Sequence, residues 1–440
     1  MFLALSLLLV IILIIVATIK FHFHPFLSLL LAGIAMGFVG GLNVDTIISK
    51  LSEGFGNTLK SIGIVIAFGT IIGTFLERSG GAKSMASTIL KLVGEKRAPL
   101  AMSITGFLVS IPVFCDSGFV ILSTLNKALS KRTGLSMAIL AVSLGTGLYA
   151  THVFVPPTPG PLAAAATIGA DVGLVLLLGL IVSIPAALAG LLWAVNYGKK
   201  FTIRPESYLE VLTPEAIPPD SVKSFAPIVV PIVLIALRSV AKYPTAPFGN
   251  GIIAHGLSFV GHPIIALFIG VFFAFFLKQS GAGGSNFEWV SAGLKNAGSI
   301  ILITGAGGAF GNILRATDFS GAIGKTMAGW HLGILLPFII AAVLKIAQGS
   351  STVAIITTAA LMVPLIGPLG YSAPAAKALV VLSIGAGAMT VSHINDSYFW
   401  VVAQFSDMDT ATALRCHSLA TLWQGLAGIL TIGLLSFLLI

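Results

Sequence analysis

Apolar runs of about 20 residues follow one another along nearly the whole chain, and this pattern constrains the fold more than any motif does. A run of that length spans a bilayer as one helix. Of the 440 residues, 56% are hydrophobic and 9% are charged, whereas soluble domains carry about 25% charged residues. No polar stretch is long enough for a second, soluble domain. The sequence therefore predicts an all-α integral membrane protein and excludes a cytosolic enzyme with a membrane anchor.

Charge and cysteine content exclude further classes. The 24 Lys and Arg residues stand in short segments between the apolar runs, which indicates membrane orientation and contact with anionic headgroups, not nucleic acid. Two distant cysteines, Cys115 and Cys416, form neither a disulfide framework nor a metal-ligand cluster. We therefore expect no metal and no cofactor. The run from Phe2 to Ile19 has no basic region before it and no small-residue cleavage site after it, which predicts a retained span.

Four pieces of the first half recur, in the same order, in the second half. The pairs are His24-Pro25 with His262-Pro263, Leu59-Lys60-Ser61-Ile62-Gly63 with Leu294-Lys295-Asn296-Ala297-Gly298, Cys115-Asp116-Ser117-Gly118 with Gly349-Ser350-Ser351-Thr352, and Gly145-Thr146-Gly147 with Gly385-Ala386-Gly387. Their separations all lie between 234 and 240 positions. Collinear order with so little drift predicts an internal repeat.

Ten crossings follow from the apolar runs and the charges between them. We expect them near 2–19, 25–42, 58–76, 134–157 and 171–196, and then near 226–241, 263–277, 296–314, 377–402 and 417–439. The run 226–241 has the shortest apolar core, because two prolines and an arginine interrupt it. Two further apolar pieces, 98–126 and 333–367, are broken by polar residues, and basic residues flank the first on both sides. A segment that starts and ends in the cytoplasm is a re-entrant hairpin.

Each half then has five crossings and one hairpin, and because five is odd the halves are inverted. The predicted domains are a first repeat at 1–198 with hairpin 98–126 and broken helix 134–157, a cytoplasmic linker at 199–224, and a second repeat at 225–440 with hairpin 333–367 and broken helix 377–402. On this topology 16 basic residues are cytoplasmic and seven are outside. That asymmetry favours both termini outside.

Polar residues interrupt the apolar segments at the hairpin tips 110–118 and 348–352 and at the breaks 145–161 and 385–397. Transporters with inverted repeats and broken helices bind substrate and coupling ions at such places, because free backbone N–H groups and helix N-termini hold anions. We expect substrate contacts from Ser117, Gly118, Thr151, His152, Gln348, Ser350, Ser351, Thr352, His393 and Asn395. We expect proton coupling by Asp116 and Asp396.

Each of these residues also has a structural explanation. A carboxylate at the bilayer centre costs about 2.5–3.5 kcal/mol, so Asp116 and Asp396 each either handle a proton or substrate or cap a helix. The two histidines could be hydrogen-bonded structural residues, and the hydroxyls of 350–352 could serve close helix packing. Lys345 either neutralises a carboxylate or extends to the membrane surface. The glycines at 305–311 indicate packing, since no strand–helix unit frames them.

The chain resembles the bacterial gluconate permease family of gluconate:proton symporters along essentially its whole length. The most specific pieces are the acidic tip before Gly118-Phe119-Val120-Ile121-Leu122, Pro156-Pro157 followed by Gly169-Ala170-Asp171-Val172-Gly173, Gln348-Gly349-Ser350, and Ser392-His393-Ile394-Asn395-Asp396 with Phe399-Trp400. The resemblance implies uptake of a sugar acid or similar carboxylate across a bacterial inner membrane. Through the ion transporter superfamily it implies a dimeric scaffold and an elevator-like transport domain. Asp116 stands where the family carries Glu, and Thr158-Pro159 where it carries His-Pro.

We therefore expect a secondary active transporter, not an enzyme, that symports a small hydroxy-carboxylate with a proton. It is expected in the bacterial inner membrane as a multi-pass homodimer. The alternatives are sodium coupling and a permease for D-serine or glycerate. Two rivals of other kinds are a membrane-embedded thiol hydrolase that uses Cys115 and His152, which gives no reason for the repeat, and a passive channel, which would show no counterflow.

Overall fold

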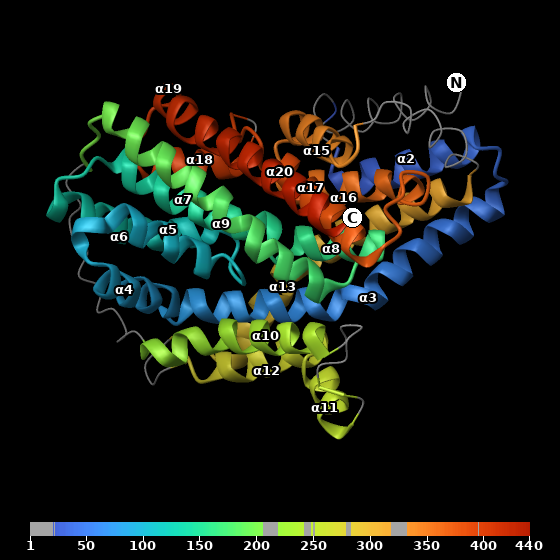
Figure 1. Ribbon diagram of the computed structural model, residues 1–440, viewed down its shortest axis with the longest axis horizontal. Coiled ribbons are helices and arrows are strands. Elements are labelled where there is room, and N and C mark those ends of the chain that lie inside the picture. Colours follow the sequence, from blue (N-terminus) through green and yellow to red (C-terminus); the bar gives the residue numbers. More distant parts are fainter. Residues whose placement is uncertain are drawn as a thin grey trace.

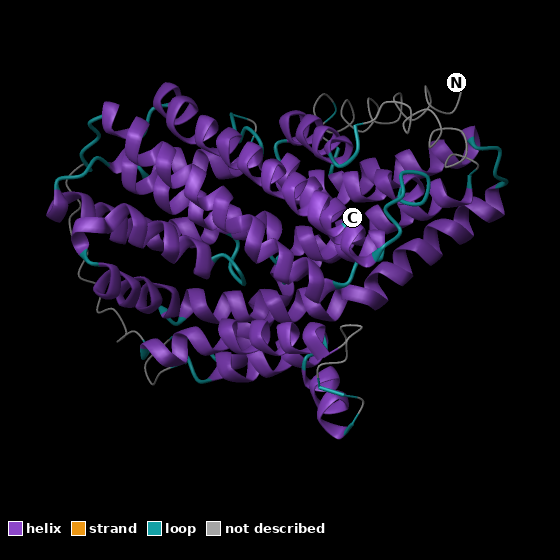
Figure 2. Cartoon of the chain, in the orientation of Figure 1, coloured by secondary structure: helices purple, strands orange, loops and turns teal. Residues whose placement is uncertain are grey.

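The computed structural model describes residues 21, 23–205, 219–241, 248–249, 251–278, 283–317, 332–394 and 396–440. Every regular element in these ranges is a helix (Figure 1, Figure 2), so the predicted all-helical class is confirmed. The expected first crossing, 2–19, and the centre of the linker lie outside the described residues.

The helices of the first half are α2 (Pro25–Val39), α3 (Val44–Arg78), α4 (Gly81–Val93), α5 (Ala98–Val109), α6 (Cys115–Thr133), α7 (Met137–Phe154), α8 (Pro159–Ile168) and α9 (Val172–Tyr197). Those of the second half are α10 (Ser221–Ala241), α11 (Ile252–Val260), α12 (Pro263–Phe275), α13 (Asn286–Ala316), α15 (Leu335–Gln348), α16 (Ser351–Met362), α17 (Pro374–Met389), α18 (Ser397–Phe405), α19 (Thr410–Ala413) and α20 (Leu419–Leu439). Within the described ranges, 6 helical stretches are long and apolar enough to cross a membrane, or 7 if the bent pair α11 and α12 is one span.

The two longest helices, α3 and α13, pack against each other through the middle of the molecule (Figure 1). Glycines bring their backbones together. A Cβ on Gly54 would lie 2.5 Å from the carbonyl oxygen of Gly308, and one on Gly293 would lie 2.8 Å from the Cα of Ile71. The first half of each helix thus meets the second half of the other, so the pair is antiparallel. Its spacing is set by backbone atoms, because no side chain fits at either contact.

Both central helices are longer than the crossings predicted at 58–76 and 296–314. Helix α3 has 35 residues and begins at Asn43, whose side chain accepts a hydrogen bond from the Thr46 amide. Helix α13 has 31 residues and begins with a capping box between Ser285 and Glu288. Such caps satisfy the free N–H groups of a first turn. The helices therefore extend past the apolar window into polar sequence, which a hydropathy pattern does not record.

The two expected hairpins each contain two helices joined by an irregular tip, but α6 continues to Thr133, past the predicted end at 126. In the first, α5 ends at Val109, and Ser110 closes the tip by donating to the carbonyl of Val113 at 3.1 Å. In the second, Gly349 takes a positive φ of 73° after α15, and the Ser350 side chain caps α16. A left-handed residue is cheap only for glycine. The chain reverses at Gly349 for that reason.

The two expected broken helices are interrupted, but the predicted breaks at 145–161 and 385–397 begin too early. Their first parts, 145–154 and 385–389, are helical and belong to α7 and α17. Helix α7 is buried along its whole length and stops at Phe154; α17 stops at Met389. The prolines at 156–161 end α7, as predicted, but a new helix, α8, begins at Pro159. Proline suits the first turn of a helix, where its missing N–H has no partner to lose. The proline cluster therefore marks both an end and a start.

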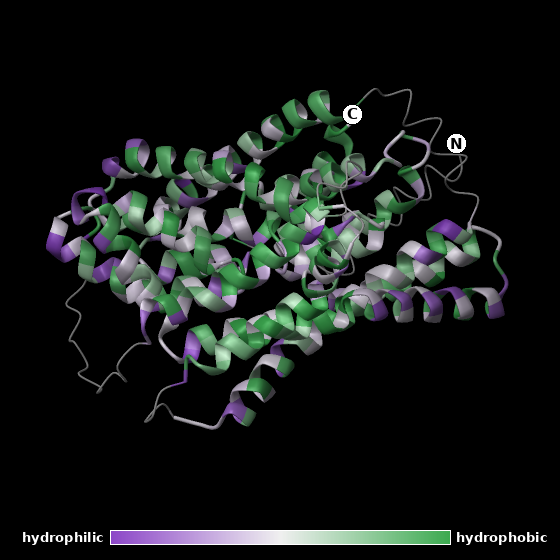
Figure 3. Ribbon diagram, turned by 60° about the horizontal axis from the view of Figure 1, so that its bottom comes forward, coloured by the Kyte–Doolittle hydropathy of each residue, from purple (hydrophilic) through white to green (hydrophobic). Residues whose placement is uncertain are grey.

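The remaining helices cover the outside of this core. Apolar side chains on α9, α12 and α20 are exposed, among them Leu192, Phe272 and Leu434, and Figure 3 shows hydrophobic residues along the helices of the periphery. Faces of this kind suit a lipid environment. Two short helices, α4 and α11, have no counterpart among the predicted crossings, because neither is long enough to span.

Candidate functional site

The tips and breaks of both halves meet in one buried region. The Tyr149 hydroxyl of α7 lies 2.5 Å from the Ser351 hydroxyl at the second tip. The Tyr398 hydroxyl of α18 donates to the carbonyl of Gly145 at 2.8 Å, and the two tyrosine rings are 5.1 Å apart. Phe119, on the first hairpin, packs edge-on against Tyr398. Residues far apart in the sequence therefore share one site.

A buried ion pair lies beside these tyrosines. Lys345 Nζ donates to Asp396 Oδ2 at 2.5 Å, and their side chains are 0% and 4% exposed. The same carboxylate oxygen accepts from the Ser392 hydroxyl at 2.5 Å. The other oxygen accepts from the Tyr398 amide at 3.1 Å and so caps α18. Of the two alternatives for Lys345, neutralisation of a carboxylate is the one the geometry supports.

Asp116 differs from Asp396 in its partners. It lies in the first turn of α6, with the Cys115 thiol 3.8 Å from Oδ2. Its Oδ1 is buried and has no hydrogen-bond partner. The charges of Asp396 and Lys345 act on it electrostatically. Asp116 is therefore a half-buried acid at the first tip, with one buried oxygen that is free to bond.

Gln348 is the corresponding free group at the second tip. Its amide nitrogen and its carbonyl oxygen are both buried, and neither has a partner. The residue ends α15 and directly precedes the left-handed Gly349. Buried polar groups are nearly always hydrogen-bonded. A donor and an acceptor without partners at a helix break indicate a place for a polar ligand or water.

The other predicted residues of the first half divide into packed and open positions. The Thr151 hydroxyl donates to the Phe107 carbonyl at 2.8 Å, and Gly118 lies against the side chain of Leu148. Ser117 lines a small cavity, and His152 is buried, lines another and has a free Nδ1. Ser117 and His152 are thus open to a ligand, whereas Thr151 is already bonded.

Those of the second half are mostly engaged. Ser350 caps α16 by accepting from the Val353 amide at 3.4 Å, and Thr352 is half-buried in the same first turn. The ring of His393 contacts the Ile346 carbonyl through Nε2 at 3.2 Å. Asn395 lies outside the described residues. Ser351 joins the buried tyrosine cluster through Tyr149, and Gln348 is the described residue of this set whose polar atoms are buried without a partner.

Sequence reasoning missed the two tyrosines and a buried histidine. His417 lies in a π-helical turn, is 0% exposed, and neither ring nitrogen has a partner. Its ring is 5.4 Å from that of Tyr398. The one available signal was the position of Tyr149 inside the predicted break, between Gly147 and His152. Nothing in the local sequence marks Tyr398 or His417.

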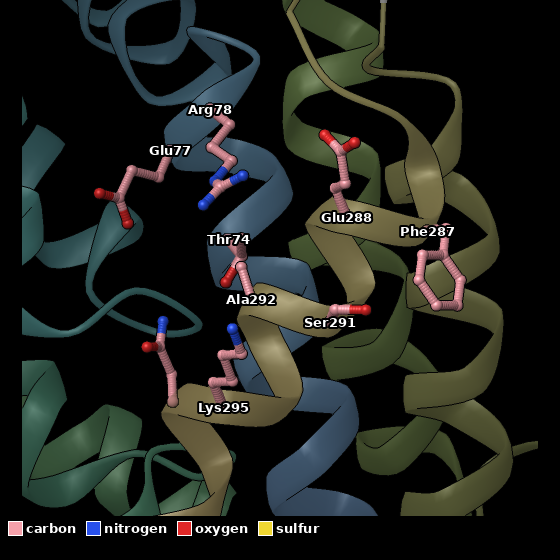
Figure 4. Close-up of a pocket in the computed structure, with 9 residues that line it drawn as sticks. Thr74, Glu77, Arg78, Phe287, Glu288, Ser291, Ala292 and Lys295 are labelled. Carbon is pink, nitrogen blue, oxygen red and sulfur yellow. The ribbon is translucent and has the colours of Figure 1, made fainter.

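A larger cavity, of about 790 Å³, opens between the end of α3 and the start of α13 (Figure 4). It is lined by Thr74, Glu77, Arg78, Phe287, Glu288, Ser291, Ala292, Lys295 and Asn296. A smaller cavity continues from it and shares Thr74, Glu77 and Asn296. That smaller cavity reaches Ser117 and Phe114 at the first hairpin tip. The smaller cavity therefore lies between the large cavity and the first tip.

No cluster of three or more His, Cys, Asp or Glu able to hold a metal ion occurs among the residues that the structure describes. A multi-pass helical bundle with buried, unpartnered polar groups at paired helix breaks defines a membrane transport protein. The model of the "GntP family permease" matches residues 2–438, and the chain belongs to the GntP family of permeases. It is accordingly a transporter of the bacterial inner membrane and not an enzyme.

Known relatives span most of the chain. An uncharacterized permease of Haemophilus influenzae is 36% identical over 86% of this chain and 80% of its own length. A gluconate permease of Pseudomonas aeruginosa is 33% identical over 96% and 94%, and an Escherichia coli D-serine transporter is 31% identical over 96% and 95%.

Solved structures with the same fold are known. One of them, the YdaH transporter of Alcanivorax borkumensis, matches with a TM-score of 0.63 at 16% identity and covers 90% of both chains. At that identity the similarity concerns the fold alone.

Proposed function

We propose that the protein takes up a small hydroxy-carboxylate, such as gluconate, together with a proton. One observation carries the proposal: unpartnered polar atoms of Asp116 and Gln348 lie at the two hairpin tips, in the region that holds a self-neutralised lysine–aspartate pair. The N-termini of α6 and α16 lie at the same tips. Helix N-termini favour anions, and an anionic carboxylate suits this set of groups.

The charges at the site supply a reason for coupling. Lys345 and Asp396 cancel each other, so an ionised Asp116 would leave one net negative charge. A substrate carboxylate beside it would then meet a like charge in an apolar setting, which is unfavourable. A proton on Asp116 removes that repulsion. Substrate and proton therefore bind together more readily than either alone, which is the thermodynamic requirement for symport.

The substrate class rests on the relatives. One is named a gluconate permease and another a D-serine transporter. Gluconate and serine both carry a carboxylate and a nearby hydroxyl. The hydroxyl of Ser351 and the amide of Gln348 suit the hydroxyl, while Ser117 and His152, which line cavities at the first tip, suit the carboxylate. Gluconate is the first choice and D-serine or glycerate the alternative, with sodium as the alternative coupling ion.

The inverted repeat is part of the proposal, and helix packing supports it. Helix α2 packs on α13 and α12 on α3; α5 packs on α7 and α15 on α17; α6 packs on α18 and α16 on α8. Each pair maps onto its partner when the halves are exchanged. His24 and His262 also cap α2 and α12 in the same way. The proposal includes the repeats 1–198 and 225–440, their re-entrant hairpins and outward termini, and a homodimer with a moving transport domain.

The experiment is transport by the purified protein in liposomes. One proton with one monovalent anion moves no net charge, so only the pH gradient drives uptake, and each pH unit supplies about 1.36 kcal/mol, or tenfold accumulation. Asp116→Asn is expected to abolish pH-driven gluconate accumulation and to retain counterflow, because the amide mimics the protonated acid. The matched control is Asp45→Asn, an exposed position on α3.

Three outcomes contradict the proposal. Accumulation by Asp116→Asn at the wild-type level removes Asp116 from coupling. Accumulation that requires sodium replaces the proton. Flux without counterflow indicates a channel.

A further inference from the structure

The large cavity between α3 and α13 has a counterpart at the other end of the same helix pair. This second cavity, of about 90 Å³, is lined by Gly54, Asn57, Thr58, Ser61, Ala166, Thr167, Gly308, Gly311, Asn312, Arg315 and Val363. Five positions that line it lie 238 residues from positions that line the large cavity. The pairs are Gly54 with Ala292, Asn57 with Lys295, Thr58 with Asn296, Thr74 with Asn312 and Glu77 with Arg315. The two cavities therefore occupy equivalent places in the two halves.

The two cavities differ in what covers them. All described residues that line the large cavity belong to α3 and α13. Helix α8 covers the small cavity, through Ala166 and Thr167. Arg315 of α13 holds α8 in this position, since its guanidinium donates to the carbonyl of Thr167 at 3.0 Å. One end of the helix pair is thus uncovered, and α8 lies over the other end, where a hydrogen bond from Arg315 joins it to α13.

The chemistry of the small cavity is that of an anion site. Arg315 is the one charged side chain among the described residues that line it, and no carboxylate in the described part of the chain pairs with it. The Thr167 hydroxyl is buried and has no partner. A guanidinium binds a carboxylate through two parallel hydrogen bonds, and here it has donors to spare beyond the one used on Thr167.

We propose that this cavity, which we call the outer subsite, is where the substrate carboxylate first binds from outside, and that Arg315 exchanges the Thr167 carbonyl for that carboxylate as α8 moves away. The inference rests on the proposed function for its ligand class and on the predicted topology for its side. Helix α8 covers the outer subsite in this conformation, although Arg315 itself is exposed, while a smaller cavity beside the large one reaches the first hairpin tip. Arg315 thus both holds α8 in place and binds the incoming anion.

The first test is the kinetics of gluconate uptake from outside. Loss of hydrogen bonds to a charged group weakens binding by roughly ten- to a hundredfold. Arg315→Gln is expected to raise KM for external gluconate by at least about tenfold. Arg315→Lys is expected to raise this KM by less, because it keeps the positive charge but lacks the planar guanidinium that forms two parallel hydrogen bonds. Lys60→Gln is the control, an exposed cation on the same end of α3 that does not line the cavity. An unchanged KM in Arg315→Gln, or a lower kcat alone, overturns the assignment.

The second test needs no substrate. Thr167→Cys places a thiol at the residue whose carbonyl Arg315 binds. Both native cysteines are buried, so protein without this change gives the background rate of labelling. An impermeant maleimide added outside is expected to label Thr167→Cys slowly, and several times faster when Arg315→Gln is combined with it. Equal labelling rates with and without Arg315→Gln overturn the proposal that Arg315 holds α8 over the cavity. If wild-type protein neither binds nor moves gluconate, the proposed substrate fails, and the labelling rates still decide whether Arg315 closes the outer subsite.

Discussion

Replacement of Lys345 by Met is expected to destabilise the folded protein by about 3 kcal/mol. Removal of one partner of a buried ion pair costs about 3–5 kcal/mol, because the other charge stays buried and unpaired. Asp396 would keep its hydrogen bonds from the Ser392 hydroxyl and the Tyr398 amide, which places the cost at the lower end. At 1.4 kcal/mol per tenfold, this lowers the folding equilibrium constant more than a hundredfold.

The assay is a denaturant titration in detergent micelles of wild type, Lys345→Met, Asp396→Asn and the double variant. Each single change leaves one buried charge, and the double change leaves none, so we expect the double variant to recover most of the lost stability. Lys60→Met is the control at an exposed position. A Lys345→Met protein that unfolds at the wild-type denaturant concentration would refute the reasoning, as would a double variant whose loss is the sum of the single losses.

Three further predictions follow from single contacts. Gly147→Ala is expected to cost about 1–3 kcal/mol of stability through overpacking against the backbone of Ser103, whereas Gly63→Ala, with no atom within 4 Å, is expected to be neutral or stabilising in the same titration. Single cysteines placed beside Lys96 and Lys127 are expected to react with impermeant maleimide only from the cytoplasmic side; labelling of either from outside contradicts the hairpin. Ser351→Ala is expected to weaken apparent substrate affinity roughly ten- to a hundredfold, and unchanged affinity in a binding titration would move the site elsewhere.

Much of the fold was predictable because breaks in apolar sequence are local signals. A cluster of prolines, or a glycine with a positive φ, ends a helix, so the ends of α7 and α15 could be placed near polar breaks in the sequence. Isolated glycines do not end a helix here, since Gly145 and Gly147 lie inside α7. Helix starts were harder. The cap at Asn43 lies 15 positions before the predicted crossing at 58, since polar residues extend a helix without adding to its hydropathy.

The candidate site was predictable in its parts but not in its pairing. Lys345 and Asp396 are 51 positions apart, and the sequence left both of their roles open. Only the packing of α15 beside α17 brings the lysine to the carboxylate. Tyr149 lies inside one predicted break and Tyr398 directly follows the other, but neither position indicates that the two rings meet. The two rings meet because α7 and α18, from opposite halves, bring them together. A single sequence does not show which distant helices pack together.

The glycine contacts between α3 and α13 have a consequence for biosynthesis. Helix α3 is complete at residue 78, and α13 does not begin until residue 286. At about 5–20 residues per second, the ribosome needs about 10–40 s to make the chain between them. During that interval the face of α3 that contains Gly54 lacks α13, the helix on which it packs. The newly made first half therefore remains in the membrane with this face of α3 in contact with lipid or with the insertion machinery.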